Sequence, residues 1–230
     1  TSTAKLGIPV AFFSLEMYTG DIHERSAANE LDISYHKLSR YKLNDAEMQK
    51  LFMCQVIEEM KLFYETEKNF NKIMSRIRIL NKKYGVKVVY IDYLQIIECD
   101  IRGLNREQTI SYMTRMFKRL ALELGIVIVV MSQLGRAVEA RPIKRPFISD
   151  LRESGAIEQD ADQIVFLYRD EVYNKDSQYR GVAEAIVGKN RHGESGTTYM
   201  HAQLKYCQFS NLDPEALNEI QGAEINGSQH

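Results

Sequence analysis

"VKVVYIDYLQ", residues 86–95, is a run of β-favouring apolar residues that reaches an aspartate, Asp92, before it continues into leucine and glutamine. Its length and its content of valine, isoleucine and tyrosine predict a strand that is buried in a sheet. A carboxylate at the end of a buried strand costs free energy unless something there needs the charge. Asp92 is therefore either a functional carboxylate or a turn former or helix cap, and the residue alone leaves both interpretations open.

The segments on either side of this stretch alternate between apolar strands and amphipathic helices. Upstream, "PVAFFSLEM" (9–17) predicts a strand, and 70–85 predicts a helix that ends in two lysines and a capping glycine. Downstream, 105–125 predicts a long amphipathic helix, and "IVIVVMSQL" (126–134) predicts another strand. The alternation, with strands that are almost continuously apolar, predicts an α/β fold with a mostly parallel sheet that is flanked by helices.

Further elements are predicted on both sides of this core. Two helices and a short strand are predicted between the first two core elements, at 21–31, 43–61 and 62–66. After a polar segment (135–162), three strands joined by tight turns predict an antiparallel C-terminal extension, at 163–171, 181–193 and 197–209. We expect residues 1–211 to form one domain and residues 212–230 to be a flexible C-terminal tail.

The composition excludes several classes of protein. The 230 residues include 30 Lys and Arg and 31 Asp and Glu, so any contact with nucleic acid requires a local cluster of charge. The longest apolar run, 126–131, is too short to cross a membrane, and we find no leader sequence. The three cysteines are scattered and predict neither a metal site nor a disulfide framework, which is typical of a cytoplasmic protein.

Polar residues follow three of the apolar strands at the point where each strand ends: Glu16, Asp92, and the pair Ser132 and Gln133. Ligands bind at the carboxyl ends of strands in open α/β sheets, so we expect these residues to share one edge. Hydrolysis of a nucleoside triphosphate fits them. Asp92 would hold Mg²⁺ through water, Glu16 would polarise the attacking water, and Gln133 would sense the terminal phosphate. For Glu16 the alternative is a solvated residue in a turn.

Two clusters of basic residues follow later in the chain. Lys189 and Arg191, in "KNRHG" (189–193), are either a solvated turn or a pair that reaches a neighbouring subunit's phosphates, as an arginine finger does. Arg141, Lys144 and Arg145, in "RPIKRPFISDLRESG" (141–155), belong to the densest positive cluster in the chain. Such a loop suits contact with a nucleic-acid backbone, and the alternative is a solvated loop without a ligand.

The motif that cradles phosphates in such sites, G-x-x-x-x-G-K-S/T, does not occur in the 230 residues. The "VGKN" stretch (187–190) contains Gly-Lys, but it follows the wrong residues and comes late in the chain. We expect the motif one strand and one loop before residue 1, with "TSTAKLG" (1–7) as the remnant of the helix that follows it. The first strand and the phosphate loop are then missing from the amino end.

Taken together, these segments resemble the C-terminal motor domain of the DnaB-type replicative DNA helicases, a hexameric branch of the RecA-like ATPases. The resemblance covers nearly everything from about residue 7 to residue 211, and "SDLRESGAIEQDAD" (149–162) is its most specific stretch. The other matching stretches, in the family's order, are "FFSLEM", "YIDYLQII", "VVMSQLGRAVEARPIKRP", the continuation "QIVFLYRDEVY", and "GKNRHGESGT". The resemblance implies a RecA-like NTPase core.

The resemblance also implies roles for individual residues. Glu16 would be the catalytic glutamate, Asp92 the Walker B aspartate that holds Mg²⁺, and Gln133 the phosphate-sensing glutamine. Lys189 and Arg191 would reach across to the next subunit's nucleotide. A loop in the central channel would follow the phosphates of the DNA strand with Arg152, Glu153, Ser154 and Gly155.

By the same resemblance, the ligands would be ATP and Mg²⁺, and the partners single-stranded DNA, five further copies in a homo-hexamer, and a primase and a helicase loader. No contact with a membrane is expected. The hexamer would move along one DNA strand and so separate the duplex during replication.

The chain departs from the family pattern in three ways: it has no phosphate loop, no linker helix that docks on the neighbouring subunit, and no N-terminal collar domain. We interpret it as part of a longer helicase rather than as a degenerate relative, because Glu16, Asp92, Gln133 and Arg191 are all present. A non-catalytic RecA-like module that binds DNA or a helicase ring is the main alternative. A recombinase-type or circadian-clock-type ATPase is a further one, and "SDLRESGAIEQDAD" argues against it.

Overall fold

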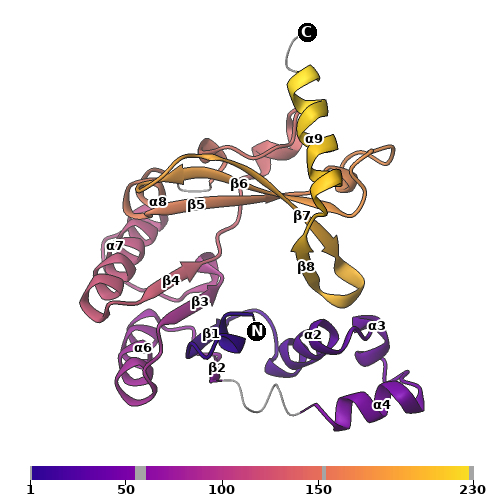
Figure 1. Ribbon diagram of the computed structural model, residues 1–230. Coiled ribbons are helices and arrows are strands. Elements are labelled where there is room, and N and C mark those ends of the chain that lie inside the picture. The colour runs from indigo at the N-terminus through magenta and orange to yellow at the C-terminus, as the bar shows by residue number, and fades with distance from the viewer. Residues whose placement is uncertain (1, 55–60, 152–153, 228–230) are drawn as a thin grey trace.

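The structure, a computed structural model, describes residues 2–54, 61–151 and 154–227, and it contains two four-stranded sheets (Figure 1). One sheet is parallel and carries helices, and the other is antiparallel. The predicted α/β class, with a parallel sheet and an antiparallel C-terminal extension, is therefore confirmed.

The parallel sheet has the strand order β2-β1-β3-β4. Its strands are β1 (Val10–Ser14), β2 (Leu62–Glu65), β3 (Val88–Asp92) and β4 (Val127–Val130). Ser14 at the end of β1 lies opposite Asp92 at the end of β3, so these two strands finish level with each other. Strands β1 and β4 end three and four residues earlier than predicted. The stretches 15–17 and 131–134 leave the sheet as loops, and these loops carry the polar residues of the edge.

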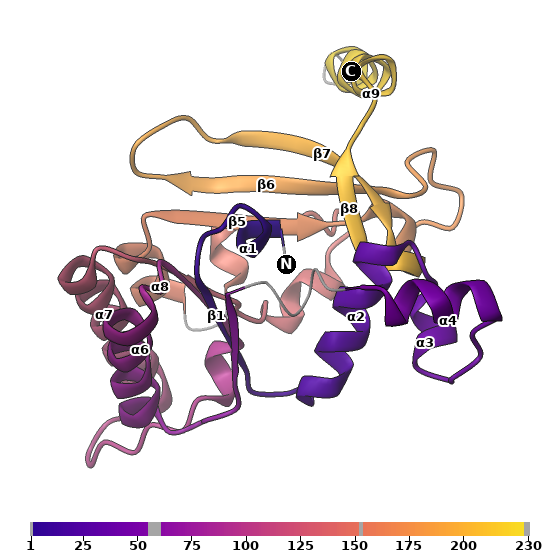
Figure 2. The same cartoon turned by 60° about the horizontal axis from the view of Figure 1, so that its bottom comes forward.

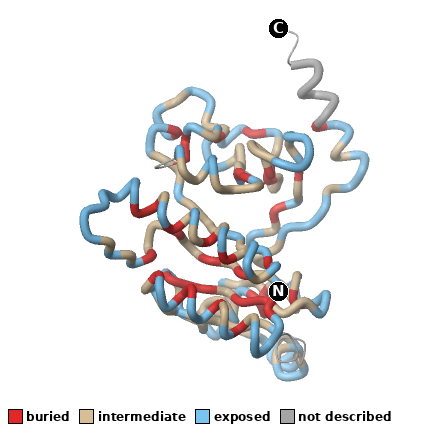
Figure 3. The backbone as a smooth tube through the Cα atoms, turned by 90° about the vertical axis from the view of Figure 1, so that its left-hand side faces the viewer, coloured by how far each residue is buried: buried red, intermediate tan, exposed pale blue. Residues whose placement is uncertain are grey.

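Two long helices cover one face of the parallel sheet: α6 (Phe70–Tyr84) and α7 (Arg106–Leu124). Their buried residues recur at helical spacing and form the main core with β1, β3 and β4, which Figure 3 shows as a buried layer. Asn105 accepts a hydrogen bond from the amide of Gln108, and the side chain of Gln108 accepts one in return, which fixes the start of α7. Gly85 ends α6 in the left-handed conformation that the predicted glycine cap requires.

A group of shorter helices lies beside the sheet, after β1: α2 (Thr19–Leu31), α3 (Tyr35–Leu38) and α4 (Asp45–Phe52). It has a small apolar core of its own, formed by Ala27, Ala28, Ile33 and Leu38. The helix predicted over 43–61 starts at Asp45 and ends at Phe52, and residues 55–60 of that prediction lie outside the described residues. The chain starts with α1 (Ser2–Lys5), whose Thr3 hydroxyl lies 3.0 Å from that of Tyr90 on β3.

The antiparallel sheet has the order β5-β6-β7-β8. Its strands are β5 (Gln163–Tyr168), β6 (Val182–Asn190), β7 (Gly196–Gln203) and β8 (Gln208–Asn211). The prediction of one strand over 197–209 is wrong at this point. The chain turns through η5 (Leu204–Tyr206) and through Cys207, which has a φ of 52°, so two strands form in place of one. Short η4 (Asp170–Val172) follows β5.

The polar segment between the sheets contains short helices: η2 (Arg136–Ala140), η3 (Ile148–Asp150) and α8 (Ser154–Asp160). Another, η1 (Leu94–Ile96), follows β3. Helix α8 packs against α7 (Figure 1), so the segment returns to the helical layer before β5 begins. The sequence pattern predicted no element here.

Helix α9 (Pro214–Gly227) projects away from the antiparallel sheet in Figures 1 and 2. It forms within the segment that we predicted as a tail, and the flexibility of that segment stays a prediction. Among the helices that the structure describes, none combines the length and the apolar character needed to cross a membrane.

Candidate functional site

The carboxyl edge of the parallel sheet brings Glu16 and Asp92 together. Asp92 is the last residue of β3, and its carbonyl oxygen accepts a 3.0 Å hydrogen bond from the amide of Leu15. Glu16, the residue after Leu15, is exposed, while Asp92 is half-buried. The peptide bond after Asp92 is cis. The register of β1 and β3 therefore places two carboxylates at one edge, as the strand pattern predicts.

The charges at this edge act on one another. Burial raises the pKa of the Asp92 carboxyl above its usual range, and the negative charge of Glu16 raises that pKa further. The positive charge of Arg25 opposes both effects. A carboxyl group whose ionised form is disfavoured by burial and by a neighbouring carboxylate makes a place where a bound cation would lower the electrostatic free energy. One or two carboxylates, completed by water and by phosphate oxygens, also match the way proteins hold Mg²⁺.

The loop that carries Gln133 belongs to the same edge. The amide of Leu94, two residues after Asp92, donates a 2.9 Å hydrogen bond to the carbonyl oxygen of Met131. The Gln95 side chain then donates to the Ser132 hydroxyl at 2.9 Å and accepts from the amide of Gln133 at 3.2 Å. These bonds join the loops after β3 and β4 and leave the side chain of Gln133 exposed. The three residues predicted from the strand ends therefore lie at one edge.

Arg25 is a residue of this site that the sequence pattern did not reveal. It lies on α2 and is exposed, and its Cζ atom is 4.9 Å from the centre of the Tyr35 ring. Its charge opposes the burial that raises the pKa of Cys207, just as it acts on Asp92. One turn further on, Asn29 donates a 3.0 Å hydrogen bond to the carbonyl oxygen of Cys207. This face of α2 thus lies between the sheet edge and the turn before β8.

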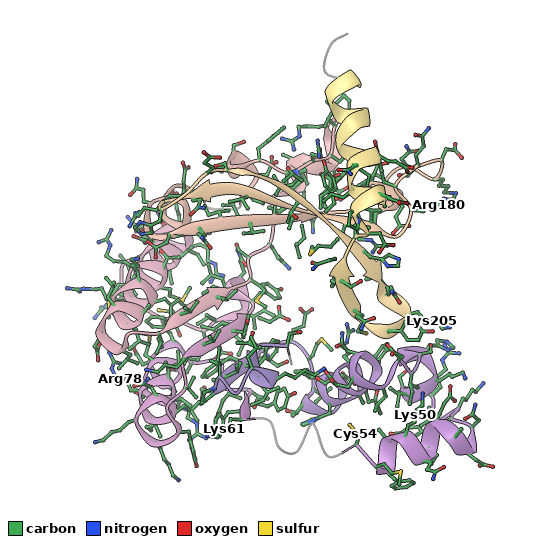
Figure 4. All side chains as sticks on the ribbon, viewed as in Figure 1. Lys50, Cys54, Lys61, Arg78, Arg180 and Lys205 are labelled. Atoms are coloured by element: carbon green, nitrogen blue, oxygen red, sulfur yellow. The ribbon has the colours of Figure 1, made fainter. Side chains whose placement is uncertain are left out.

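In Figure 4, Lys205 on η5, in the same turn, lies above the α2–α4 helices. Helices α2 and α3 both contact η5. The placement of Arg25 depends on these contacts between segments far apart in the chain, so no local pattern signals it.

Lys189 and Arg191 lie elsewhere, at the end of β6. The Lys189 ammonium donates to the carbonyl oxygens of Glu158 and, at 2.8 Å, Ala161. Arg191 pairs with Asp162 at 3.3 Å and donates to the carbonyl oxygen of Gln159 at 3.1 Å. Among the described residues, no hydrogen bond or ion pair joins them to the carboxylates of the sheet edge. Their action on a neighbouring subunit stays a prediction.

The basic residues of the polar segment are engaged within the chain. Arg141 forms two hydrogen bonds with Asp150, at 3.0 and 2.7 Å, and Arg145 pairs with Glu184 of β6. Lys144 donates to two backbone carbonyl oxygens. These contacts give the cluster a structural role, and its contact with DNA stays a prediction.

The structure describes only the second half of the predicted channel loop. Arg152 and Glu153 lie outside the described residues, and Ser154 and Gly155 form the first turn of α8.

Sequence reasoning also missed an apolar cavity of about 290 Å³. Its lining includes Leu134, the residue after Gln133. Stacked Tyr168 and Tyr173, with ring centres 5.9 Å apart, line it, and burial raises the pKa of Tyr168 to about 12.

Over the residues that the structure describes, no group of three or more His, Cys, Asp or Glu side chains forms a metal site. A metal ion at the sheet edge would therefore depend on one or two protein carboxylates and on ligands from a bound molecule.

A family model described as "DnaB-like helicase C terminal domain" matches residues 1–211. The chain is 38% identical over 208 residues to "Replicative DNA helicase DnaB" of Geobacillus stearothermophilus, covering 89% of this chain and 46% of that protein. It is 41% identical over 204 residues to "Probable plasmid replicative DNA helicase" of Chlamydia trachomatis, covering 87% and 44%. The chain thus spans about half the length of the curated relatives it matches.

Two solved structures are similar to the whole fold. One is an "ATPase Domain", which superposes with a TM-score of 0.86 at 35% identity, over 91% of this chain and 76% of that one. "The Structure Of A DnaB-Like Replicative Helicase And Its Interactions With Primase" gives the same TM-score and identity, over 91% and 52%. The fold described above is therefore shared with an ATPase domain and with a DnaB-like replicative helicase.

Proposed function

The chain belongs to the family of DnaB-like helicase C-terminal domains, and from this membership we propose that it is the motor part of a ring-shaped replicative DNA helicase. The motor would couple ATP hydrolysis to movement along single-stranded DNA and so separate the duplex. The observation that carries the proposal is the meeting of Glu16 and Asp92 at the carboxyl edge of the parallel sheet, where the charge of Glu16 raises the pKa of the Asp92 carboxyl.

Each residue of the edge has a part in this chemistry. Asp92 would hold a magnesium ion through its water ligands, and that ion would supply positive charge to the phosphates. Glu16, exposed beside it, would accept a proton from the attacking water. Gln133 has an exposed side chain that could donate to the terminal phosphate, and the bonds through Gln95 fix the loop from which it reaches.

The remaining predicted residues would act between subunits and on DNA. In a homo-hexamer, Lys189 and Arg191 would contact the phosphates bound by the next copy. Arg152 to Gly155 would contact the phosphates of the DNA strand. Arg141, Lys144 and Arg145 would also bind the DNA backbone through their positive charge. We further propose that a primase and a helicase loader bind the assembled ring, and that it acts on DNA in the cytoplasm.

A second candidate function has one specific observation in its favour. No G-x-x-x-x-G-K-S/T motif occurs in these 230 residues, so the phosphates would need their main anchor from outside residues 1–230. If no such anchor is supplied, the chain would be a non-catalytic module that binds DNA or a helicase ring.

The experiment that separates the two uses the complete product of the reading frame that encodes residues 1–230. ATP hydrolysis is measured with and without single-stranded DNA. We expect stimulation by DNA, and a loss of about 100-fold or more in kcat for Glu16→Gln and for Asp92→Asn, because each removes a group that acts on the reacting atoms.

Glu123→Gln is the matched control for this experiment. Glu123 is a carboxylate on the outer face of α7, where it pairs with Arg78, which Figure 4 labels on α6. Its loss should leave kcat within about twofold. Hydrolysis that is absent, or that survives both edge substitutions, would refute the motor proposal and favour the non-catalytic module.

A further inference from the structure

Lys189 and Arg191 both bind the carboxyl end of α8. The last turn of a helix leaves carbonyl oxygens without partners inside the helix, and it carries partial negative charge. In α8 the carbonyl oxygens of Glu158, Gln159 and, just beyond the helix, Ala161 accept from these two cations. The two cationic side chains at the end of β6 are thus hydrogen-bonded to the carboxyl end of α8 and do not extend freely into solvent.

The carboxylate of Asp162 also contacts Arg191, beside the end of α8. One of its oxygens accepts from Lys118 of α7, and the other pairs with Arg191 at 3.3 Å. The backbone carbonyl oxygen of Asp162 also accepts from the amide of Arg191, at 2.8 Å. The hydrogen bond from Lys118 lowers the pKa of the Asp162 carboxyl, and the positive charges of Arg191 and His192 lower it further. Asp162 therefore stays ionised and binds both the main chain and the side chain of Arg191.

The contacts leave part of the Arg191 guanidinium available. A guanidinium has five N–H donors. Nη1 uses one donor on Asp162 and Nη2 uses one on the carbonyl oxygen of Gln159. The Arg191 side chain remains 45% exposed. The group is thus held at two of its donors, and among the described residues the other N–H donors make no hydrogen bond. In this state a phosphate can be bound without prior ordering of the side chain.

We propose that Asp162 is a positioning residue, which holds the guanidinium of Arg191 on the end of α8 so that its remaining N–H donors meet the phosphate oxygens of a nucleotide bound by the neighbouring subunit. The inference rests on the proposed function, since it requires that Arg191 acts on a nucleotide. Asp162 itself touches neither the nucleotide nor the reacting atoms. Without its carboxylate, Arg191 would keep its charge but lose its orientation.

Kinetics of the complete reading-frame product test this directly. Asp162→Asn should lower kcat about tenfold with KM changed less than about twofold, because the finger stabilises charge that develops in the transition state. Asp162→Glu, which keeps the charge, should recover part of the loss.

Asp160→Asn is the matched control. Asp160 lies at the same end of α8 and accepts a 2.6 Å hydrogen bond from Thr114 of α7. The substitution makes the same change in charge near the same helix end but touches no contact of Arg191, so kcat should stay within about twofold. Equal losses for Asp160→Asn and Asp162→Asn would mean a purely structural role and overturn the proposal.

A double variant separates this proposal from the function on which it rests. Arg191→Ala should lower kcat strongly, and Asp162→Asn added to it should cost nothing more, because Asp162 acts through Arg191. If Arg191→Ala has no effect, the motor function proposed above fails. If Arg191→Ala is slow while Asp162→Asn alone is unchanged, or if the two losses multiply, only the positioning role fails.

A measurement on the 230-residue chain without nucleotide gives a second readout. A guanidinium held at Nη1 and Nη2 rotates slowly about its Nε–Cζ bond, so its two Nη nitrogens give separate NMR signals. We expect separate signals for Arg191 in the parent chain and in Asp160→Asn, and a single averaged signal in Asp162→Asn. Separate signals that persist in Asp162→Asn would overturn the proposal, whatever the kinetics show.

Discussion

At the scale of the residue, Asp92 shows how a half-buried carboxylate weakens the fold that carries it. Its pKa is raised by burial first and by Glu16 second, so the folded protein disfavours the ionised form. Between the usual carboxyl pKa and the raised one, the folded state binds more protons than the unfolded state. Stability therefore falls as the pH rises through this window, and the loss is complete above the raised pKa.

Asp92→Asn should remove this loss. We expect the melting temperature at pH 7 to rise by about 1 °C, a small effect because Asp92 is only half-buried and water screens its charge. The difference between variant and parent should shrink as the pH is lowered through the window. Differential scanning calorimetry between pH 3 and pH 7 measures both, with Asp176→Asn, an exposed carboxylate of the loop before β6, as control. A variant less stable than the parent at pH 7 would contradict the sign of the effect.

At the scale of the element, the pairing of β5 with β6 depends on a glycine. A Cβ atom added at Gly188 would lie 2.6 Å from Cε2 of Phe166 on β5, closer than such atoms approach. Phe166 is buried with Leu151 and Ile164 in a small apolar core, so it has little room to move. Glycine here allows an aromatic ring to pack directly on the neighbouring strand.

Gly188→Ala should therefore lower the free energy of unfolding by about 1–3 kcal/mol, the usual cost of overpacking a core. Gly196→Ala is the control, because it also lies in the antiparallel sheet, on β7, and an added Cβ would meet nothing within 4 Å. Urea unfolding of the three proteins measures the difference. Equal stabilities for the two variants would show that Phe166 yields without cost.

The helices illustrate the opposite case, in which local sequence is sufficient. The start of α7 is set by the reciprocal bonds between Asn105 and Gln108, and the end of α6 by Gly85. Both ends fall within one residue of where the pattern predicts them. The polar segment before β5 has no such pattern, because its helices are only one or two turns long and depend on their neighbours.

At the scale of the whole molecule, the densest cluster of basic residues joins the polar segment between the sheets to the antiparallel sheet. Arg141 pairs with Asp150 of η3, whose side chain is only 6% exposed, and Arg145 pairs with Glu184 of β6. The Arg141 guanidinium also lies 4.6 Å from the centre of the Phe147 ring. The positive charge is thus largely matched inside the chain, in keeping with a net charge of −1.

Arg141→Gln should lower the free energy of unfolding by roughly 2–3 kcal/mol, because it leaves the buried Asp150 carboxylate without its cation. The loss is smaller than for a buried carboxylate with no remaining partner, because Asp150 still accepts a hydrogen bond from the amide of Phe147. Asp150→Asn added to Arg141→Gln should recover part of the loss by removing the buried charge. Chemical unfolding of the single and double variants measures the coupling. An Arg141→Gln protein as stable as the parent would show that the arginine is free for another partner.

The order of the core strands and the long helices, the parallel and antiparallel halves, and the meeting of Glu16, Asp92 and Gln133 at one edge followed from the sequence alone. The reason is that period, capping residues and strand ends are local, and a parallel sheet brings every carboxyl end to the same side. Only the tertiary structure decided where Arg25 lies, which carboxylates pair with the basic cluster, and that Lys189 and Arg191 sit on α8 beside Asp162. Apart from Arg141 and Asp150, which are nine positions apart, those contacts join residues tens of positions apart, and their energies depend on distance and burial that no local pattern contains.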